Sequence, residues 1–506
     1  MSTKSFIALL AALCTAAAPT EGLFAASTSP SALDLNLPSL GTAAGAELSP
    51  ADEYELGKQL MTQVRAAPTY MSDPETSEYL NRLGYQLVSN AQTYTYSFFF
   101  FPIRDETLNA FALPGGFIAV HTGTIISAQN ESELAGVIGH EIGHVTQRHI
   151  ARMIEGQKSN LALTVGSILL AILAARAGGD SGGHAAAAIA MGSQAAMIQS
   201  QLNYSQDAER EADRVGLQTL YRAGFDPHGL EGFFARLQSS NRFYRSAAPA
   251  YLSTHPLTTE RMADMENRTR QLPTRMHADS LDFRLIQQRV RVLQETTHDG
   301  YLKVRRNMER ELRNASGSAR CALEYGLSVA SEKLNDSAAA LNHAKNTASI
   351  CSTGESAVLE RNLLRARFLN AGTSAAKEAV LKDARRAVER YPLSDMMSSN
   401  YVDMLYELGR HEELIRFLRN GSSLSSNDPD YHALLARSYE KLGRKSLQYQ
   451  HTGEMYALLG ATEAAVYQYG MAQKAADGDF YTMSEIDARL RELRQQMIQE
   501  KKDRER

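Results

Sequence analysis

Apolar residues recur at helical spacing along most of the chain. Ser49-Pro50 predicts a helix start, because Ser caps the free N–H groups of a first turn and Pro fits that turn. Asp73-Pro74 predicts a second start, and Tyr79, Leu83 and Leu87 follow it four residues apart. The pattern therefore predicts a mainly α fold.

Three β-prone runs interrupt this helical pattern. They cover Tyr94–Ile103, Leu108–Ala112 and Phe117–His121, with Leu113-Pro114-Gly115-Gly116 as a turn between the last two. Helical periodicity returns after them. We expect residues 48–284 to form a mostly helical domain that contains a small β-sheet.

From about residue 285 the pattern changes to paired amphipathic helices. Leu408-Gly409-Arg410 and Leu442-Gly443-Arg444 recur at the 34-residue period of tetratricopeptide repeats. Frames that start near residues 361, 395, 429 and 463 fit this period, after one or two irregular repeats. Stacked helix pairs bury a continuous core and leave a concave face. We expect residues 285–506 to form an α-solenoid that binds protein, with a purely structural array as the alternative.

The start of the chain indicates export. Residues 1–26 combine Lys4, a short apolar run and small residues, as a secretory signal peptide does. Residues 27–47 are rich in Ser, Ala, Gly, Pro and Leu without periodicity, and we expect a linker there. The net charge of −4 is too small to indicate nucleic-acid binding.

Two apolar runs, 161–175 and 185–198, are each shorter than the roughly 20 residues that span a bilayer. We expect a mobile helical hairpin over 161–198 rather than a membrane anchor. Covering the active-site cleft, peripheral contact with membrane lipid and simple packing on the domain all remain open for it.

The chemistry centres on His140-Glu141-Ile142-Gly143-His144. His140 and His144 are separated by about 400° of helix, so both imidazoles face one side and suit a shared metal ion. Glu141 lies about 100° around the helix, where it reaches water beside the metal rather than the metal itself. This spacing is typical of a metalloprotease whose glutamate is the general base. A helix that carries these residues by chance is the alternative.

A third ligand must come from another segment, because Gln147 and Ile150 stand where the longer zinc signature needs Gly and His. Glu209 and Asp213 share one face of a second helical segment, from which Glu211 points away. We assign Glu209 to the metal and Asp213 to the free ring N–H of a ligand histidine. A solvated charged helix is the alternative.

These residues resemble a known family. The His140–Val145 motif with Arg148-His149, together with Glu209–Asp213, is similar to the gluzincin peptidases related to CAAX prenyl endopeptidases. The resemblance implies one zinc ion on the two motif histidines and Glu209, with Glu141 as the catalytic residue.

With the predicted leader and repeats, the resemblance extends over nearly the whole chain to bacterial periplasmic members of the family. It implies a zinc endopeptidase in the periplasm, associated with the outer membrane, whose substrates are unfolded or misassembled outer-membrane β-barrel proteins. The repeats would dock on the assembly machinery of those proteins. The competing hypothesis is a chaperone or scaffold of outer-membrane assembly whose metal site is structural or vestigial.

The resemblance also places Asn109, Ala110, Phe111 and Ala112 beside the metal. An edge strand there would bind an extended substrate by strand addition. An ordinary hairpin that packs under the active-site helix is the alternative.

Two further histidines accompany the motif. His255 precedes Pro256 in a predicted loop, from which it would fill the fourth zinc position or bind substrate; a structural loop histidine is the alternative. His149 would lie about 180° from His140 on a continuous helix, which excludes it as a ligand of the same metal.

Cys321 and Cys351 are the cysteines that remain once the leader is removed. Residues 319–333 and 337–350 are predicted helices on either side of a turn at Leu334-Asn335-Asp336. Antiparallel packing of these helices brings the two cysteines together, and an oxidising compartment favours a disulfide. Two buried thiols on separate helix faces are the alternative.

Overall fold

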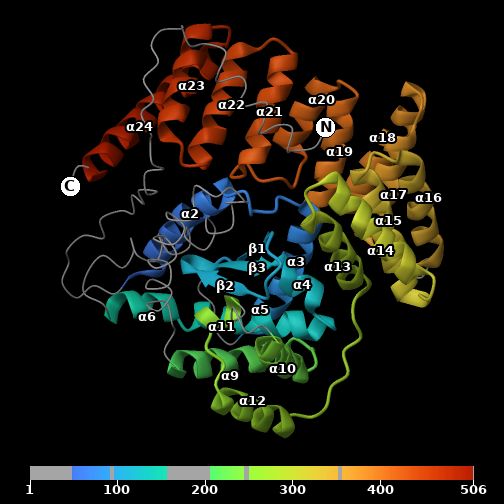
Figure 1. Cartoon of the computed structure of the whole chain (residues 1–506). Helices are drawn as coiled ribbons and strands as arrows, with labels where there is room; N and C mark the ends of the chain where they lie inside the picture. Colours follow the sequence, from blue (N-terminus) through green and yellow to red (C-terminus); the bar gives the residue numbers. More distant parts are fainter. Residues whose placement is uncertain (1–47, 92–95, 157–205, 244–249, 352–355, 505–506) are drawn as a thin grey trace, which may run out of the picture. The chain divides into compact units, whose positions relative to one another are not determined.

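The computed structural model describes residues 48–91, 96–156, 206–243, 250–351 and 356–504. The predicted signal peptide (1–26), linker (27–47) and apolar hairpin (161–198) lie outside the described residues. These described residues are mainly helical and contain one small sheet, as the sequence pattern predicts (Figure 1).

The elements around the histidine motif come first in the chain. They are α2 (Pro50–Ala66), α3 (Pro74–Val88), β1 (Phe99–Ile103), β2 (Ala110–Leu113), the 3₁₀ turn η1 (Pro114–Gly116), β3 (Phe117–His121), α4 (Thr122–Ser127), α5 (Glu131–Thr146), α6 (His149–Gly156), α9 (Gln206–Arg222), α10 (His228–Phe243), α11 (Ala250–Thr254) and α12 (Thr259–Gln271).

The predicted helix starts are present. Ser49 and Asp52 form a reciprocal capping box at the start of α2, and the Asp73 side chain accepts the Thr76 N–H at the start of α3. These contacts satisfy backbone N–H groups that a first turn leaves without partners.

The sheet has the order β1-β3-β2, with β1 parallel and β2 antiparallel to β3. The connection between β2 and β3 is short because Gly115 and Gly116 adopt φ angles of 75° and 93°, which side chains disfavour. In the order β1-β3-β2, β2 is an edge strand, and it contacts α5.

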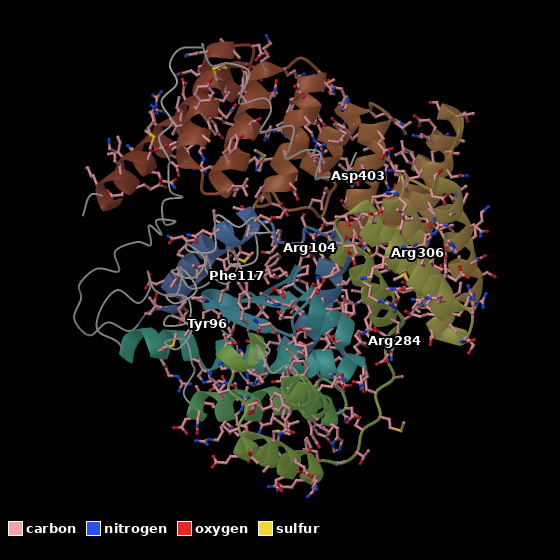
Figure 2. The ribbon with its side chains drawn as sticks, in the orientation of Figure 1. Tyr96, Arg104, Phe117, Arg284, Arg306 and Asp403 are labelled. Atoms are coloured by element: carbon pink, nitrogen blue, oxygen red, sulfur yellow. A yellow bond between two sulfur atoms is a disulfide. The ribbon has the colours of Figure 1, made fainter. Side chains whose placement is uncertain are left out.

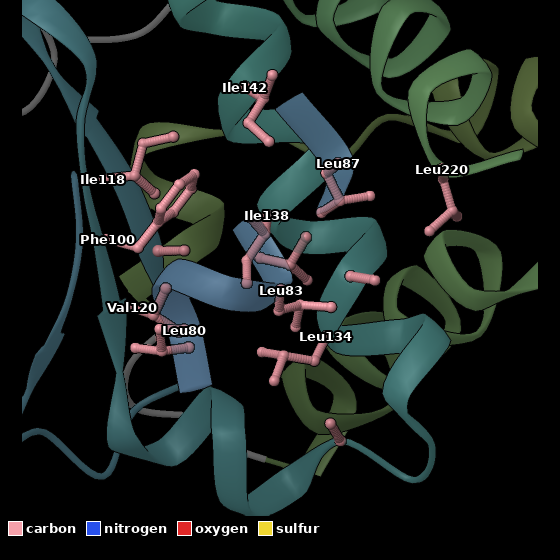
Figure 3. Packing of buried hydrophobic residues seen from close by; sticks show 14 of the residues in the cluster. Leu80, Leu83, Leu87, Phe100, Ile118, Val120, Leu134, Ile138, Ile142 and Leu220 are labelled. Atoms are coloured by element: carbon pink, nitrogen blue, oxygen red, sulfur yellow. The ribbon is translucent and has the colours of Figure 1, made fainter. Parts of the chain in front are cut away.

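The main core lies between the sheet, α3, α5 and α9 (Figure 3). Phe100, Ile118 and Val120 of the sheet meet apolar residues of α3 and α5, including Leu83 and Ile138. All five side chains are buried. Packing of this density holds α5, and so the histidine motif, in one orientation.

The remaining described helices follow as consecutive pairs. They are α13 (Leu281–Gln294) with α14 (His298–Leu312), α15 (Gly317–Lys333) with α16 (Ser337–Ile350), α17 (Ala357–Asn370) with α18 (Ser374–Arg390), α19 (Asp395–Glu407) with α20 (His411–Asn420), α21 (Pro429–Lys441) with α22 (Lys445–Leu458), and α23 (Thr462–Ala475) with α24 (Phe480–Arg504). The last four pairs begin within a few residues of the predicted frames.

The recurrent Leu-Gly-Arg sequence is a helix-ending motif. Gly409 and Gly443 have φ angles of 72° and 71°, and the N–H groups of Arg410 and Arg444 return to carbonyls five residues earlier. A glycine in the left-handed region allows this closure of the last turn. The 34-residue spacing therefore arises because the same turn recurs between the two helices of successive pairs.

Helix α13 packs into two cores. Phe283, Ile286 and Val290 join the core around α5, whereas Leu285 and Val292 join the core around α15. Arg104, which follows β1 and is labelled in Figure 2, also donates to the Leu293 carbonyl. The boundary predicted between residues 284 and 285 falls inside this helix, and the division into domains remains a prediction.

None of the helices in the described ranges is long and apolar enough to cross a membrane.

A disulfide joins Cys321 in α15 to Cys351 at the end of α16, with their Cα atoms 6.1 Å apart. The side chain of Asp336 caps α16 and so fixes the turn between the two helices. Both cysteines are buried.

We predict no free thiol in the denatured, unreduced mature protein, and a loss of about 3 kcal/mol in unfolding free energy when both cysteines become serine. Thiol titration and urea denaturation measure these quantities. Reduced wild-type protein should be as unstable as the double variant. Two titratable thiols per mature chain would contradict the bond.

A partly buried pair of histidines lies between α21 and α22. The Nδ1 atoms of His432 and His451 are 2.9 Å apart, and His432 Nε2 lies 2.9 Å from the Ser426 carbonyl oxygen. Burial, the His432 ring and the charge of Arg419 lower the pKa of His451 to about 3. Burial also lowers the pKa of His432, so both rings are neutral at neutral pH in the folded protein.

The unfolded chain binds a proton at His451 near pH 6.5, whereas the folded chain resists protonation down to about pH 3. The stability that this histidine contributes is therefore present above pH 6.5 and is lost as the pH falls through that window. We predict that wild type loses about 1 to 2 kcal/mol more than His451→Gln between pH 7 and pH 5, measured by urea denaturation. The exposed His298→Gln is the control. Parallel pH profiles for wild type and His451→Gln would reject the prediction.

Candidate metal centre

Helix α5 presents the motif histidines inside the core. Asn130 caps the helix by accepting the Glu133 N–H. His140 and His144 project from the same side one turn apart, with their Nε2 atoms 3.0 Å apart, and neither side chain is exposed to solvent. Two imidazole nitrogens at this separation suit one shared metal ion.

Helix α9 crosses α5 at very close range. A Cβ atom on Gly216 of α9 would lie 2.9 Å from the His140 Cα atom, and one on Gly143 of α5 would lie 2.8 Å from the Ala212 carbonyl oxygen. Glycine at both positions permits this approach. The crossing brings Glu209 and Asp213 of α9 next to the histidines.

Four buried side chains converge at this crossing: His140, His144, Glu209 and His255. Glu209 carboxylate oxygens lie 3.5 Å from His140 Nε2, 3.4 Å from His144 Nε2 and 3.0 Å from His255 Nδ1. His140 Nε2 and His255 Nδ1 are 3.4 Å apart. Tetrahedral zinc with bonds of about 2.0 to 2.1 Å places its ligand atoms roughly 3.3 Å from one another. The four side chains therefore fit a zinc ion.

Asp213 and Arg261 contact this cluster on the side away from the shared metal position. Asp213 Oδ1 lies 2.9 Å from His140 Nδ1, the ring nitrogen that faces away from the other donors. Arg261 makes two hydrogen bonds to Asp213, both of 2.8 Å, and its Nη1 atom lies 2.7 Å from Glu209 Oε2. The same guanidinium also donates to the Pro256 carbonyl, next to His255. One buried cation thus links both carboxylates to the loop of the fourth donor.

The helix does not continue through His149. α5 ends at Thr146, and Arg148 adopts a left-handed φ of 54° before α6 begins. The expected position 180° from His140 is therefore wrong, because the break turns His149 back toward the site. Its Nδ1 atom lies 2.8 Å from His144 Nδ1, and its Nε2 atom lies 3.1 Å from Glu211, which points away from the four donors. His149 supports a cluster histidine from outside.

The Glu141 carboxylate is fully buried next to the cluster, with Oε1 3.5 Å from His255 Nε2. Burial raises the pKa of Glu141, although the charges of His255 and His140 and the backbone N–H of Ala112 oppose the increase. A carboxylate with a raised pKa is a better proton acceptor near neutral pH than a free glutamate.

The buried carboxylates of Asp213 and Glu209 favour positive charge on the groups around them. Burial disfavours protonation of His140, but hydrogen bonds and the charges of Asp213 and Glu209 raise its pKa to about 10. Burial instead holds the pKa of His144 well below its usual range. Burial alone would raise the pKa of Glu209. The charge of His255 and the hydrogen bonds that Glu209 accepts from His140 and His144 instead lower it well below its usual range. A cation among these donors matches this charge pattern.

The predicted strand residues lie close by. Asn109 precedes β2, and Ala110, Phe111 and Ala112 belong to that strand. Asn109 and the strand are buried, and the Leu108 carbonyl accepts the N–H of Tyr251 at 3.3 Å, which ties the start of the strand to α11. His121 at the end of β3 lies 3.2 Å from Thr107 Oγ1.

Sequence reasoning did not assign roles to Arg261, Tyr251 or Glu211. Arg261 follows the His255-Pro256 loop by a few residues, and its position near a histidine loop is a weak signal. Tyr251 stands one helical turn before His255, so helical spacing could have placed them on one face.

Comparison with known proteins agrees with this geometry. Residues 74–269 match the model of peptidase family M48. The β-barrel assembly-enhancing protease of Escherichia coli strain K12 is 32% identical over 472 residues, which cover 91% of each chain. The protein of the same name from Yersinia pestis is 38% identical over 286 residues, 56% of each chain. The mitochondrial metalloendopeptidase OMA1 of Schizosaccharomyces pombe is 32% identical over 164 residues, which cover 32% of this chain and 44% of that one.

The alignment with the Escherichia coli protein covers both the metal cluster and the paired helices. All four donors of the cluster are present in this chain. This chain therefore belongs to peptidase family M48 and is a metalloendopeptidase homologous to the β-barrel assembly-enhancing proteases.

Proposed function

We propose that the protein is a zinc endopeptidase of the periplasm that degrades misassembled outer-membrane β-barrel proteins and assists their assembly. The observation that carries the reaction is the buried Glu141 carboxylate beside four donors that fit zinc. His140, His144 and Glu209 would hold the ion throughout catalysis. Asp213 and His149 would orient the two α5 histidines through their outer ring nitrogens.

Zinc, when bound, supplies a Lewis acid that lowers the pKa of a coordinated water to about 7. Glu141 accepts the proton of the attacking water and returns it to the leaving amine nitrogen as the C–N bond breaks. Its burial supports this role, because water that would otherwise compete for the proton is excluded.

His255 is proposed to close the site at rest. Its Nδ1 atom occupies the fourth donor position, whereas a catalytic zinc needs that position open for water. His255 lies at the end of a five-residue helix followed by Pro256, so a small rotation of this loop would open the site. Arg261, which donates to the Pro256 carbonyl, is placed to hold the loop.

The β2 edge is proposed to bind substrate. An extended peptide paired with β2 would pass close to Glu141, whose charged form the Ala112 N–H favours. Asn109 and the residues of β2 are buried, so neighbouring segments must move aside before a strand can pair there. Strand addition recognises backbone rather than side chains, which suits unfolded substrates of varied sequence.

The substrate class and location rest on the homologues and on the sequence. The relatives are named for enhancing β-barrel assembly, the disulfide suits an oxidising compartment, and residues 1–26 predict export. The paired helices from α13 onward are proposed to be tetratricopeptide repeats that dock on the outer-membrane assembly machinery. Peripheral membrane contact through residues 161–198 remains a hypothesis.

A chaperone or scaffold with a structural metal site is the second candidate. One observation favours it: four protein donors surround the metal position, as in structural zinc sites. The two candidates differ in what happens when Glu141 or His255 is changed.

Replacing Glu141 with Gln should lower cleavage of an unfolded protein substrate at least about 100-fold, because the general base is lost. Zinc content should not change, because Glu141 is not among the four donors. Proteolysis assays together with metal analysis measure both effects, and Glu260→Gln, on the exposed start of α12, is the control. Equal cleavage by wild type and Glu141→Gln would favour the chaperone hypothesis.

Replacing His255 with Ala should increase proteolysis several-fold while zinc is retained, because three protein donors remain and the fourth position opens to water. The matched control is His228→Ala, a partly exposed histidine of α10. Loss of zinc from His255→Ala would instead show that the fourth donor is structural. Lower activity with zinc retained would assign His255 to substrate binding and reject autoinhibition.

A further inference from the structure

The hydroxyl of Tyr251 has no evident structural purpose. The side chain is fully buried, and its hydroxyl makes no hydrogen bond within the described part of the chain. A buried polar group without a partner costs roughly 1 to 3 kcal/mol. A phenylalanine would fill the same space without that cost, so packing does not account for the hydroxyl.

The Tyr251 ring is held next to the metal cluster. It stacks on His255 with ring centroids 4.6 Å apart and planes 29° apart, and its centroid lies 6.3 Å from that of His140. Phe233 packs edge-on against it at 5.4 Å. The ring therefore sits between the apolar core of α10 and the donors that surround the metal position.

The backbone places the same residue next to the proposed substrate strand. The Tyr251 N–H donates to the Leu108 carbonyl, immediately before Asn109 and β2. Tyr251 thus bonds to the residue that precedes Asn109 and β2, and its ring stacks on the histidine proposed to leave the metal. A scissile carbonyl delivered by β2 to the cluster would arrive in this neighbourhood.

The hydroxyl is a donor in this environment. A tyrosine hydroxyl has an ordinary pKa of about 10, so it carries its proton at neutral pH. Arg261 is already committed to Asp213, Glu209 and the Pro256 carbonyl, which leaves the tyrosine hydroxyl as an uncommitted donor.

We propose that the Tyr251 hydroxyl donates a hydrogen bond to the scissile carbonyl oxygen as that oxygen becomes an oxyanion. The assignment rests on the proposed peptidase function. Water oxygen bonds to the carbonyl carbon, Glu141 takes the water proton, and the carbonyl π electrons move to the oxygen that faces Tyr251. When these electrons return, the C–N bond breaks and the amine nitrogen receives the proton from Glu141. Tyr251 keeps its own proton throughout.

This role explains why the hydroxyl is left without a partner at rest. A donor that is already positioned and not engaged elsewhere gives its full hydrogen bond to charge that develops only during the reaction. The interaction is stronger with the oxyanion than with the neutral carbonyl, so it raises kcat more than it lowers KM.

The test is Tyr251→Phe in the full-length zinc-loaded protein, which keeps the ring and removes only the hydroxyl. We expect kcat on an unfolded substrate to fall about 100-fold, the usual loss for one oxyanion donor, with KM and zinc content unchanged. Thermal stability should be equal to or above that of wild type, because the unpartnered hydroxyl is gone. A peptide phosphinate that mimics the tetrahedral intermediate should bind more weakly by a similar factor, whereas acetohydroxamate, which binds only the metal, should bind equally.

The matched control is Tyr79→Phe. Tyr79 is also buried in the main core, but its hydroxyl donates to Glu131 at 2.9 Å. This variant should lose stability and keep wild-type kcat, the reverse of the pattern expected for Tyr251→Phe.

Wild-type kcat in Tyr251→Phe would overturn the assignment. A stability loss with parallel losses of zinc and of both inhibitors would also overturn it, because the hydroxyl would then be structural. If wild type cleaves no faster than Glu141→Gln, the proposed function itself fails and the assignment fails with it. Cleavage that depends on Glu141 but not on the Tyr251 hydroxyl leaves the function standing and rejects only the oxyanion role.

Discussion

The close crossing of α5 and α9 is the constraint on which the site depends. Gly143 and Gly216 remove the side chains that would hold these helices apart, so a carboxylate from α9 reaches the imidazoles of α5 within a dry core. Isolated carboxylates and imidazoliums are costly in such surroundings, and here they compensate one another. A Cβ atom at Gly143 or Gly216 would clash with the backbone of the other helix and force α5 and α9 apart.

Arg261 completes this charge balance and joins it to the His255 loop. Its guanidinium contacts Asp213 and Glu209 on one side and the Pro256 carbonyl on the other. The same contacts that hold the carboxylates of the metal site therefore also position the His255 loop. Tyr251, on the short helix α11 before that loop, connects it to the start of β2 through one backbone hydrogen bond. The proposed substrate strand and the proposed opening at His255 are thus linked through Tyr251.

Much of this arrangement is predictable from the sequence where helical periodicity decides it. Residues four apart share a helix face, so the spacing puts His140 and His144 on one face of α5. The same spacing puts Glu209 and Asp213 on one face of α9. The repeat frames follow from glycines that end successive helices. The break before His149 is not predictable, because a left-handed arginine such as Arg148 has no clear sequence signal. The parallel pairing of β1 with β3 is also not predictable, and neither is the pair of hydrogen bonds from Arg261 to Asp213. Both depend on contacts between segments that are distant in the sequence.

We propose that a fourth protein donor closes the zinc site at rest and that the site opens for catalysis. X-ray absorption at the zinc edge tests this proposal most directly in the full-length protein. We expect three nitrogen donors and one carboxylate oxygen at about 2.0 to 2.2 Å in wild type, and one fewer imidazole with an added water oxygen in His255→Ala. The same spectrum for both proteins, with two imidazoles in each, would contradict it.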